Sequence, residues 1–312
     1  MRLVLLDYSP YGNVYDAVSN RRLVRAAADA GYTLDLVPWG GVRLAAGPEG
    51  LAARGRAADG RDLDLAAADC VLPRFDARDA RDLALVLGTV RWLAAMGVPT
   101  MPGPDAILAA EDKVETARRL VALGLPAPRS AVVAAPGSPE TREGLDAVVE
   151  AVGGYPVVVK APVGWGGHGV ALAESRAALR SWLDLAAQAA PNATYLVQAH
   201  VAHDVSVHVV AAEGRVVLHG QKTVAEGEFR TNARLGGREA ATRLTAEERE
   251  IALTALAGFG IDAGSVDLAR TAGGPVVLEV NACTGLAGEH DDPIADAFVA
   301  AAASVARRAG RG

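Results

Sequence analysis

The chain has 312 residues, of which 51% are hydrophobic and 22% are charged, and its formal net charge is −6. This composition excludes a wholly disordered chain, and the negative charge argues against electrostatic binding of nucleic acid or of an anionic membrane. Two cysteines, Cys70 and Cys283, are too few for a disulfide framework, so we expect a reduced, cytoplasmic protein. No stretch has the roughly 20 apolar residues that a membrane helix needs, and we assign the longest, 297–305, to a terminal helix.

The first hundred residues alternate between short apolar runs and segments with helical spacing. This alternation predicts a small parallel sheet with helices on both faces. Residues 40–68 are rich in Gly, Ala, Arg and Asp and have weak periodicity, so we expect a loop and a short helix there. The expected strands are 3–7, 32–37, 70–72 and 98–101, and the expected helices are 19–30 and 79–96.

Two further units follow, one from about residue 103 and one from about residue 195. A Gly-Leu-Pro-Ala-Pro break at 124–128 ends a helix, and Thr245 with Glu248 forms a capping box that opens another. The sequence therefore predicts an α/β protein with units at 1–102, 103–194 and 195–312. The expected strands of the last two units are 130–134, 156–160, 195–198, 204–211, 215–219, 264–269 and 275–280, and the helices are 105–123, 140–152, 246–259 and a terminal helix.

Lysine is rare in this chain, because only Lys113, Lys160 and Lys222 are lysine among 31 basic residues. A coding bias explains the abundance of arginine but not the three exceptions. Lysine is a compact point charge on a flexible stem, which arginine cannot imitate in a tight phosphate site. The three lysines are therefore candidate phosphate ligands, and chance survival is the alternative.

A glycine-rich loop, 164–169, follows the strongest predicted strand and precedes a second strand-like run from Val170. Glycines allow backbone N–H groups to approach a phosphate closely. The spacing fits neither a P-loop nor a dinucleotide-binding turn, since no helix opens after the loop. The pattern favours a hairpin that folds over a bound phosphate, and an ordinary surface hairpin is the alternative.

Two carboxylates and an amide form the third candidate group. Glu279 and Asn281 are two apart on a predicted strand and so point to the same face, and a neighbouring strand can bring Asp267 beside them. Hard oxygen ligands of this kind hold Mg²⁺ when nucleotide phosphates complete its shell. The alternative, a solvated face of an edge strand, is disfavoured because the flanking residues are apolar.

Taken in order, these features resemble the ATP-grasp superfamily, and most closely the RimK-type ligases and the related amino-group-carrier ligases of lysine and arginine biosynthesis. The resemblance is strong from about residue 70 onward and rests on topology before it. It implies an N-terminal parallel α/β domain and two α+β subdomains that clamp ATP. The matching phrases are at 71–74, 95–99, 112–113, 124–128, 164–174, 228–232, 236–237 and 278–281.

The resemblance also implies a role for each candidate residue. Nucleotide contacts are implied for Lys113, Lys160, Gly166, Gly167, Gly169, Gln198, Val201 and Asp204. Ligands of Mg²⁺ or Mn²⁺, with two ions, are implied for Asp267, Glu279 and Asn281. Catalytic roles at the phosphates and the acyl phosphate are implied for Lys222, Arg230 and Asn232.

The function implied is an ATP-dependent carboxylate–amine ligase that works through an acyl phosphate. We expect small amino-acid-like substrates, no nucleic-acid or membrane partner, and a homo-oligomer, either dimer or tetramer. Three alternatives stay open: an ATP-grasp kinase of a small molecule, a RimK-like glutamate ligase acting on a protein tail, and a degenerate nucleotide-binding module.

Some residues depart from the RimK-type pattern. Ala199 stands where a glutamate is usual, Ser206 stands where an arginine is usual, and the segment after Asn281 is also different. These positions border the nucleotide and acceptor sites, so they favour a small acceptor over a protein tail. His200, His203 and His208 have no cysteine partner and are not expected to bind zinc, and Cys283 is expected to be a small buried residue.

Overall fold

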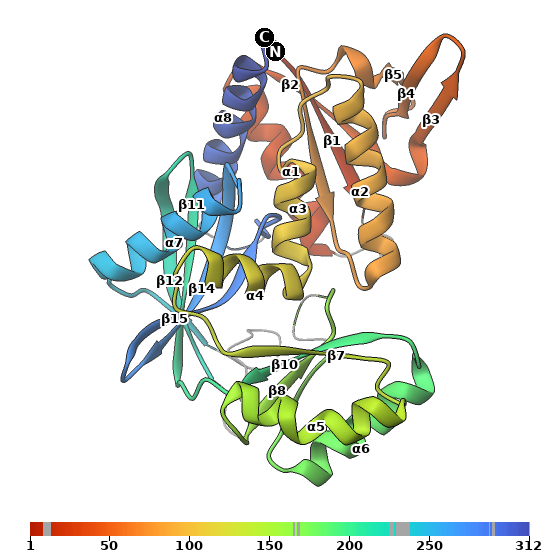
Figure 1. Ribbon diagram of the computed structural model, residues 1–312. Helices are drawn as coiled ribbons and strands as arrows, with labels where there is room; N and C mark the ends of the chain where they lie inside the picture. The colour runs from red at the N-terminus through yellow and green to blue at the C-terminus, as the bar shows by residue number, and fades with distance from the viewer. Residues whose placement is uncertain are drawn as a thin grey trace.

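A parallel three-stranded sheet forms the N-terminal part of the computed structural model (Figure 1). Its order is β2 (Thr33–Pro38), β1 (Arg2–Tyr8), β6 (Cys70–Phe75), and its parallel pairing agrees with the alternating pattern of the sequence. The fourth predicted strand, 98–101, is reduced to one bridge between Val71 and Thr100, so that prediction is wrong. The structure describes residues 1–8, 14–164, 166, 169–224, 228, 238–286, 288 and 291–311.

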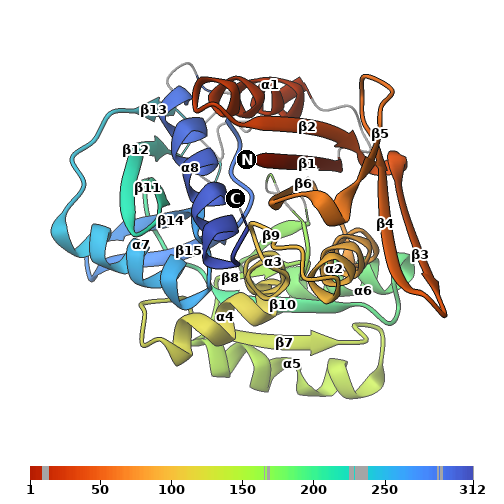
Figure 2. The same cartoon turned by 90° about the horizontal axis from the view of Figure 1, so that it is seen from above.

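Helices cover both faces of this sheet. Leu5 of β1 lies in a buried cluster with residues of α1 (Val14–Asp29) and α8 (Asp292–Arg308), which lie side by side (Figure 2). Leu6 points the other way, into a cluster with residues of α2 (Ala80–Ala95). Successive side chains of β1 point to opposite faces of the sheet, so this apolar strand contributes to a hydrophobic core on each face. No helix among the described residues is long and apolar enough to cross a membrane.

The segment 40–68 is a small antiparallel sheet and not the loop and helix that the sequence predicts. Its strands are β3 (Val42–Gly47), β4 (Gly50–Arg56) and β5 (Asp62–Asp64), in that order. Most of these residues are exposed, and only a few, such as Ala53 and Leu63, reach the core. Small residues on the exposed face hide the period of two, which explains the error. Two short 3₁₀ turns flank the sheet, η1 (Trp39–Gly41) and η2 (Leu65–Ala67).

The central part is a four-stranded sheet with two helices, α5 (Pro139–Val152) and α6 (Arg176–Ala189), on one face (Figure 1). Strands β8 (Val157–Lys160) and β9 (Val170–Ala173) pair antiparallel, with Lys160 opposite Val170, so the predicted hairpin around the glycine loop is confirmed. The strand order is β7 (Ser130–Ala134), β10 (Thr194–Ala199), β8 (Val157–Lys160), β9 (Val170–Ala173).

A five-stranded antiparallel sheet forms the C-terminal part, between α7 (Ala246–Gly258) and α8. The capping box of Thr245 and Glu248 at the start of α7 is confirmed. Alternate residues of β11 (Val205–Ala212) divide between the two cores: Val209 packs with the α7 side and Val210 with the α8 side. The order is β13 (Arg238–Ala240), β12 (Arg215–Thr223), β11 (Val205–Ala212), β14 (Ala263–Thr271), β15 (Gly274–Asn281).

The single helix predicted over 105–123 is in fact two helices, α3 (Pro104–Glu111) and α4 (Lys113–Ala122). Asp112 breaks it, because its backbone is extended and its side chain accepts hydrogen bonds from the Val114 and Glu115 amides. An aspartate in this role is a strong N-cap. The break places Lys113 at the first position of α4.

The segment after β15 is tied to elements from the other end of the sequence. Arg74 of β6, which is buried, donates to the Thr284 carbonyl at 2.7 Å. The Leu286 amide donates to Ser19 Oγ at 2.9 Å, and Arg22 donates to the Leu286 carbonyl at 3.0 Å. The backbone that follows Asn281 is therefore held by β6 and α1.

Candidate active site

One row of side chains crosses the C-terminal sheet at the point where the predicted ligands lie. His208 of β11 is the register partner of Asp267 of β14, which in turn is the partner of Glu279 of β15. Val266 and Leu268, the neighbours of Asp267, are buried in the α7 core. Asp267 therefore points to the opposite face, as strand alternation requires. The prediction that an adjacent strand brings Asp267 beside Glu279 is confirmed.

Glu279 and Asn281 share that face by ordinary strand alternation, and a bulge in β15 lies directly before Glu279. The pairing shifts after Asp267, so that Leu268 lies opposite Val277 and one residue of β15 is extra. Val277 and Val280 both enter the α7 core, although they are three apart. A regular strand cannot place residues three apart on one face, and the extra residue of the bulge makes this possible.

Two nitrogen groups, a histidine ring and an ammonium, approach one oxygen of Asp267. His208 Nδ1 lies 3.0 Å from Oδ1, and Lys222 Nζ lies 3.5 Å from the same atom. Burial opposes ionisation of this carboxyl group, but the charges and hydrogen bonds of Lys222 and His208 outweigh it and lower the pKa of Asp267. Asp267 is therefore a carboxylate over the ordinary pH range.

The donor set is suited to a hard divalent cation whose shell is completed by a substrate. It consists of two carboxylates and one amide oxygen, from Asp267, Glu279 and Asn281. Among the described residues, no group of three or more His, Cys, Asp or Glu side chains is arranged to hold a metal. The set is thus incomplete by itself, which is typical of cation sites shared with nucleotide phosphates.

The other two lysines approach the same carboxylates from the central part of the molecule. Lys160 ends β8, and burial lowers its pKa to about 8, with Lys113 acting in the same direction and Glu279 against it. Lys113 donates from Nζ to the Gly164 carbonyl at 2.6 Å. Lys160 thus interacts electrostatically with Glu279 and with Lys113, and Lys222 lies near Asp267. Two of the three lysines therefore lie by the candidate ligands, and the third, Lys113, lies near Lys160.

The remaining predicted nucleotide residues lie on the connection from β10 to β11 and on the glycine loop. Gln198 is buried and donates to Ser130 Oγ at 2.9 Å, so its side chain is already used within the sheet. The Val201 carbonyl accepts from His203 Nδ1 at 2.7 Å, and Asp204 is exposed. Gly166 and Gly169 have φ of 67° and 68°, a conformation that favours glycine. Gly167, Arg230 and Asn232 lie outside the described residues.

Two residues near the site are not among those that the sequence predicts. Burial raises the pKa of Glu111 to about 7, with Lys113 opposing the shift and Glu279 and Asp76 adding to it. Glu111 ends α3, and the expectation of one continuous helix concealed it. The sequence predicts of His208 only that it does not bind zinc, and the register that places it opposite Asp267 has no signal in the sequence.

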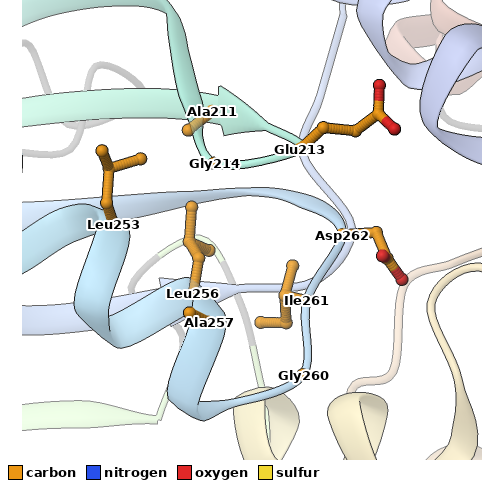
Figure 3. A pocket seen from close by; sticks show the side chains of 9 residues that line it. All are labelled: Ala211, Glu213, Gly214, Leu253, Leu256, Ala257, Gly260, Ile261 and Asp262. Atoms are coloured by element: carbon orange, nitrogen blue, oxygen red, sulfur yellow. The ribbon is translucent and has the colours of Figure 1, made fainter.

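Two hollows are described elsewhere on the molecule. One of about 280 Å³ lies where the β11–β12 turn meets the end of α7, and is lined by Leu253, Leu256 and Ile261 with Glu213 and Asp262 (Figure 3). The other, of about 220 Å³, lies between α5 and α6. None of their lining residues belongs to the predicted site, so neither is assigned to the substrate.

The family is decided by comparison with known proteins. A family model described as "RimK-like ATP-grasp domain" matches residues 110–300. The chain belongs to the RimK-like ATP-grasp family. A "Probable alpha-L-glutamate ligase" from Serratia proteamaculans (strain 568) is 32% identical over 290 residues, which cover 92% of this chain and 90% of that protein. The "Ribosomal protein bS6--L-glutamate ligase" of Escherichia coli O7:K1 (strain IAI39 / ExPEC) is 34% identical over 223 residues, or 70% of this chain and 72% of that protein.

Solved structures agree on the fold. The RimK domain protein ATP-grasp from Sphaerobacter thermophilus DSM 20745 gives a TM-score of 0.68 at 21% identity, covering 97% of this chain and 99% of that one. D-alanine--D-alanine ligase from Bacillus anthracis complexed with ATP gives 0.70 at 16%, with 99% of both chains covered. The predicted α/β ATP-grasp fold is confirmed, and so is the assignment to ATP-dependent ligases that form carbon–nitrogen bonds.

Proposed function

We propose that this RimK-like ligase joins a small amino-acid-like acid to an amine through an acyl phosphate and releases ADP and phosphate. The observation that carries the proposal is the meeting of opposite charges on one sheet face. Asp267 and Glu279 lie opposite one another, Lys222 lies beside Asp267, and Lys160 interacts electrostatically with Glu279. Such preorganised charge is what phosphoryl transfer needs, since its transition state is stabilised chiefly by electrostatics.

The nucleotide, in this proposal, lies between the central and C-terminal sheets. Lys113 and Lys160 would contact the phosphates, and the glycines at 166, 167 and 169 would let the loop approach them. Gln198 and Val201 would offer backbone groups to adenine, and Asp204 would bind the ribose. Support comes from the tie between Lys113 and the Gly164 carbonyl, because it places that ammonium beside the loop.

Asp267, Glu279 and Asn281 would hold Mg²⁺ or Mn²⁺, with two ions in the full complex. The bound cations would neutralise phosphate charge that would otherwise repel an attacking carboxylate. The fit is supported by the hard oxygen donors and by the charges that keep Asp267 ionised. Lys222 would move from Asp267 to a phosphate when the nucleotide binds.

The reaction itself needs no covalent bond to the protein. An oxygen of the acid attacks the γ-phosphorus and the bond to ADP breaks. The amine nitrogen then attacks the acyl carbon, phosphate leaves with its bonding electrons, and the proton lost by the nitrogen passes to phosphate or water. Arg230 and Asn232 are proposed to hold the acyl phosphate. Burial raises the pKa of Cys283, so its thiol stays protonated and is a poor nucleophile.

The acceptor is proposed to be a small amine. Support comes from Ala199 and Ser206, which differ from the usual residues of protein-glutamylating relatives. A protein tail is the second candidate, favoured by the relative named as a ligase of glutamate to ribosomal protein bS6.

ADP release provides the test. We would measure it with Mg²⁺ across amino acids, singly and in pairs, and identify products by mass spectrometry. A product equal to acid plus amine less one water supports the proposal. A stable phosphorylated product that needs no amine would replace it with a kinase, and glutamate added to a protein would correct the acceptor alone.

A further inference from the structure

The His208 ring lies next to Asp267, one of the proposed cation ligands. It lies on β11 between Gly220 of β12 and Asp267 of β14 in the same cross-strand row. Gly220 has no side chain, so in this row the ring has a side-chain neighbour only on the side of Asp267. Its ring is 21% exposed and the carboxylate that it meets is 16% exposed, so the contact is largely shielded from water.

The contact fixes which oxygen of Asp267 is occupied. An ionised carboxylate only accepts hydrogen bonds, so the proton in the 3.0 Å contact is on His208 Nδ1, whatever the charge of the ring. Lys222 approaches the same atom, Oδ1. Among the described residues, the hydrogen bond and the ion pair found for Asp267 both end on Oδ1, and none is found on Oδ2. One oxygen is thus held by the protein and the other is left for a ligand.

The two partners of Asp267 differ in stiffness. Lys222 has a flexible four-carbon stem and can turn to a phosphate, whereas a histidine has only two side-chain torsions and is set by its strand. In the proposed nucleotide complex, where Lys222 would contact a phosphate, His208 would be the group that still holds Oδ1. The ring therefore keeps the carboxylate oriented in the state in which the cation binds.

We propose that His208 is a positioning residue that holds Asp267 Oδ1 and presents Oδ2 to the divalent cation. This inference rests on the proposed function, since it requires a cation at Asp267. Groups that orient metal ligands typically change metal affinity by about 10- to 100-fold when removed. Loss of His208 should therefore weaken the cation and leave binding of metal-free nucleotide unchanged.

The test compares three substitutions of His208 in the full chain. Asparagine places its amide nitrogen at the same number of bonds from Cα as Nδ1, glutamine places it one bond further, and leucine has no donor. Mn²⁺ binding in the presence of ADP would be measured from the electron paramagnetic resonance signal of free Mn²⁺. ADP affinity without metal would be measured by calorimetry, and Asp267→Asn would serve as the reference for loss of the site.

We expect His208→Asn to bind Mn²⁺ within about threefold of the wild type, and His208→Leu and His208→Gln to bind it about 10- to 100-fold more weakly. Equal affinity in all three variants, or equal weakening in all three, would overturn the role of Nδ1. If the leucine variant does not fold, the asparagine–glutamine pair decides the question alone. Wild-type Mn²⁺ affinity in Asp267→Asn would instead overturn the proposed cation site, so the two failures are distinguishable.

Discussion

Strand β14 carries two contrasting charge clusters only three residues apart. At its far end, Arg270 donates from Nε and Nη2 to the two oxygens of Glu248, at 2.6 and 3.0 Å, and the Thr245 amide donates to the second oxygen at 2.9 Å. Glu248 is 3% exposed and both of its oxygens are occupied. Asp267, by contrast, has contacts from the described residues on Oδ1 and none on Oδ2.

The contrast separates a structural carboxylate from one prepared for a ligand. Burial opposes ionisation of both groups, and positive partners lower the pKa of both. Both oxygens of Glu248 already accept hydrogen bonds, so little capacity is left for another partner. These hydrogen bonds connect α7, β14 and the turn before α7. Asp267 retains one oxygen with no protein donor in the described part of the chain. Geometry of the partners, and not the pKa, distinguishes the two roles.

Removing the charge at the ligand carboxylates should have the largest effect. Glu279→Gln and Asp267→Asn should lower turnover by about 10³-fold or more, because a neutral amide is a poor ligand for a hard cation. ADP release at saturating Mg²⁺ measures this effect. Circular dichroism should show a folded protein, and Glu248→Gln is the matched control, with turnover close to that of the wild type. Near wild-type turnover of Glu279→Gln would refute its role.

Removing the charge at Glu248 should act on stability instead. Glu248→Gln should lower the free energy of unfolding by about 2 kcal/mol, roughly 30-fold in the folding equilibrium, because it leaves Arg270 without its carboxylate. Urea denaturation measures the change. The exposed pair of Arg43 and Asp62 is the control, and Asp62→Asn should change stability by less than about 0.5 kcal/mol.

Nucleotide affinity should depend on pH through Lys160. Its pKa of about 8 is lowered by burial, so the ammonium is lost as the pH rises through that value. A nucleotide that needs the charged form should bind roughly tenfold more weakly at pH 9 than at pH 7. Calorimetry with ADP would show this slope. Lys160→Arg keeps its charge at pH 9, so the ADP affinity of this variant should change little between pH 7 and pH 9. If its affinity falls as much as that of the wild type, another group is responsible for the pH dependence.

The smallest expected effect is a change in the free energy of unfolding when Glu111 is substituted. Its pKa is raised from 4.5 to about 7, so the unfolded chain ionises first and stability falls as the pH rises between these values. Glu111→Gln removes this penalty and should stabilise the protein by about 1 kcal/mol at pH 8, roughly fivefold in the folding equilibrium. Thermal unfolding at pH 8 and pH 4.5 tests this, and the gain should vanish at the lower pH.

Local patterns in the sequence predict the site better than they predict its surroundings. Alternation along one strand places Glu279 and Asn281 together, and the rarity of lysine singles out Lys160. The role of His208 has no such local signal, because strand register depends on the whole sheet. The break at Asp112 is hidden because apolar spacing continues across it, although an aspartate before a helix is a recognisable cap. Domain limits at 102 and 194 stay predictions.

The hydrogen bonds that hold the segment after β15 determine where the chain could be truncated without loss of these contacts. The family match spans 110–300, yet Ser19, Arg22 and Arg74, which hold the backbone at 284–286, lie before it. A fragment cut to the matched region would keep Glu279 and Asn281 but lose every one of these three anchors. The two chain ends, in contrast, lie close together (Figure 1). Joining them and opening the chain elsewhere would preserve the anchors, so circular permutation should be tolerated where truncation is not.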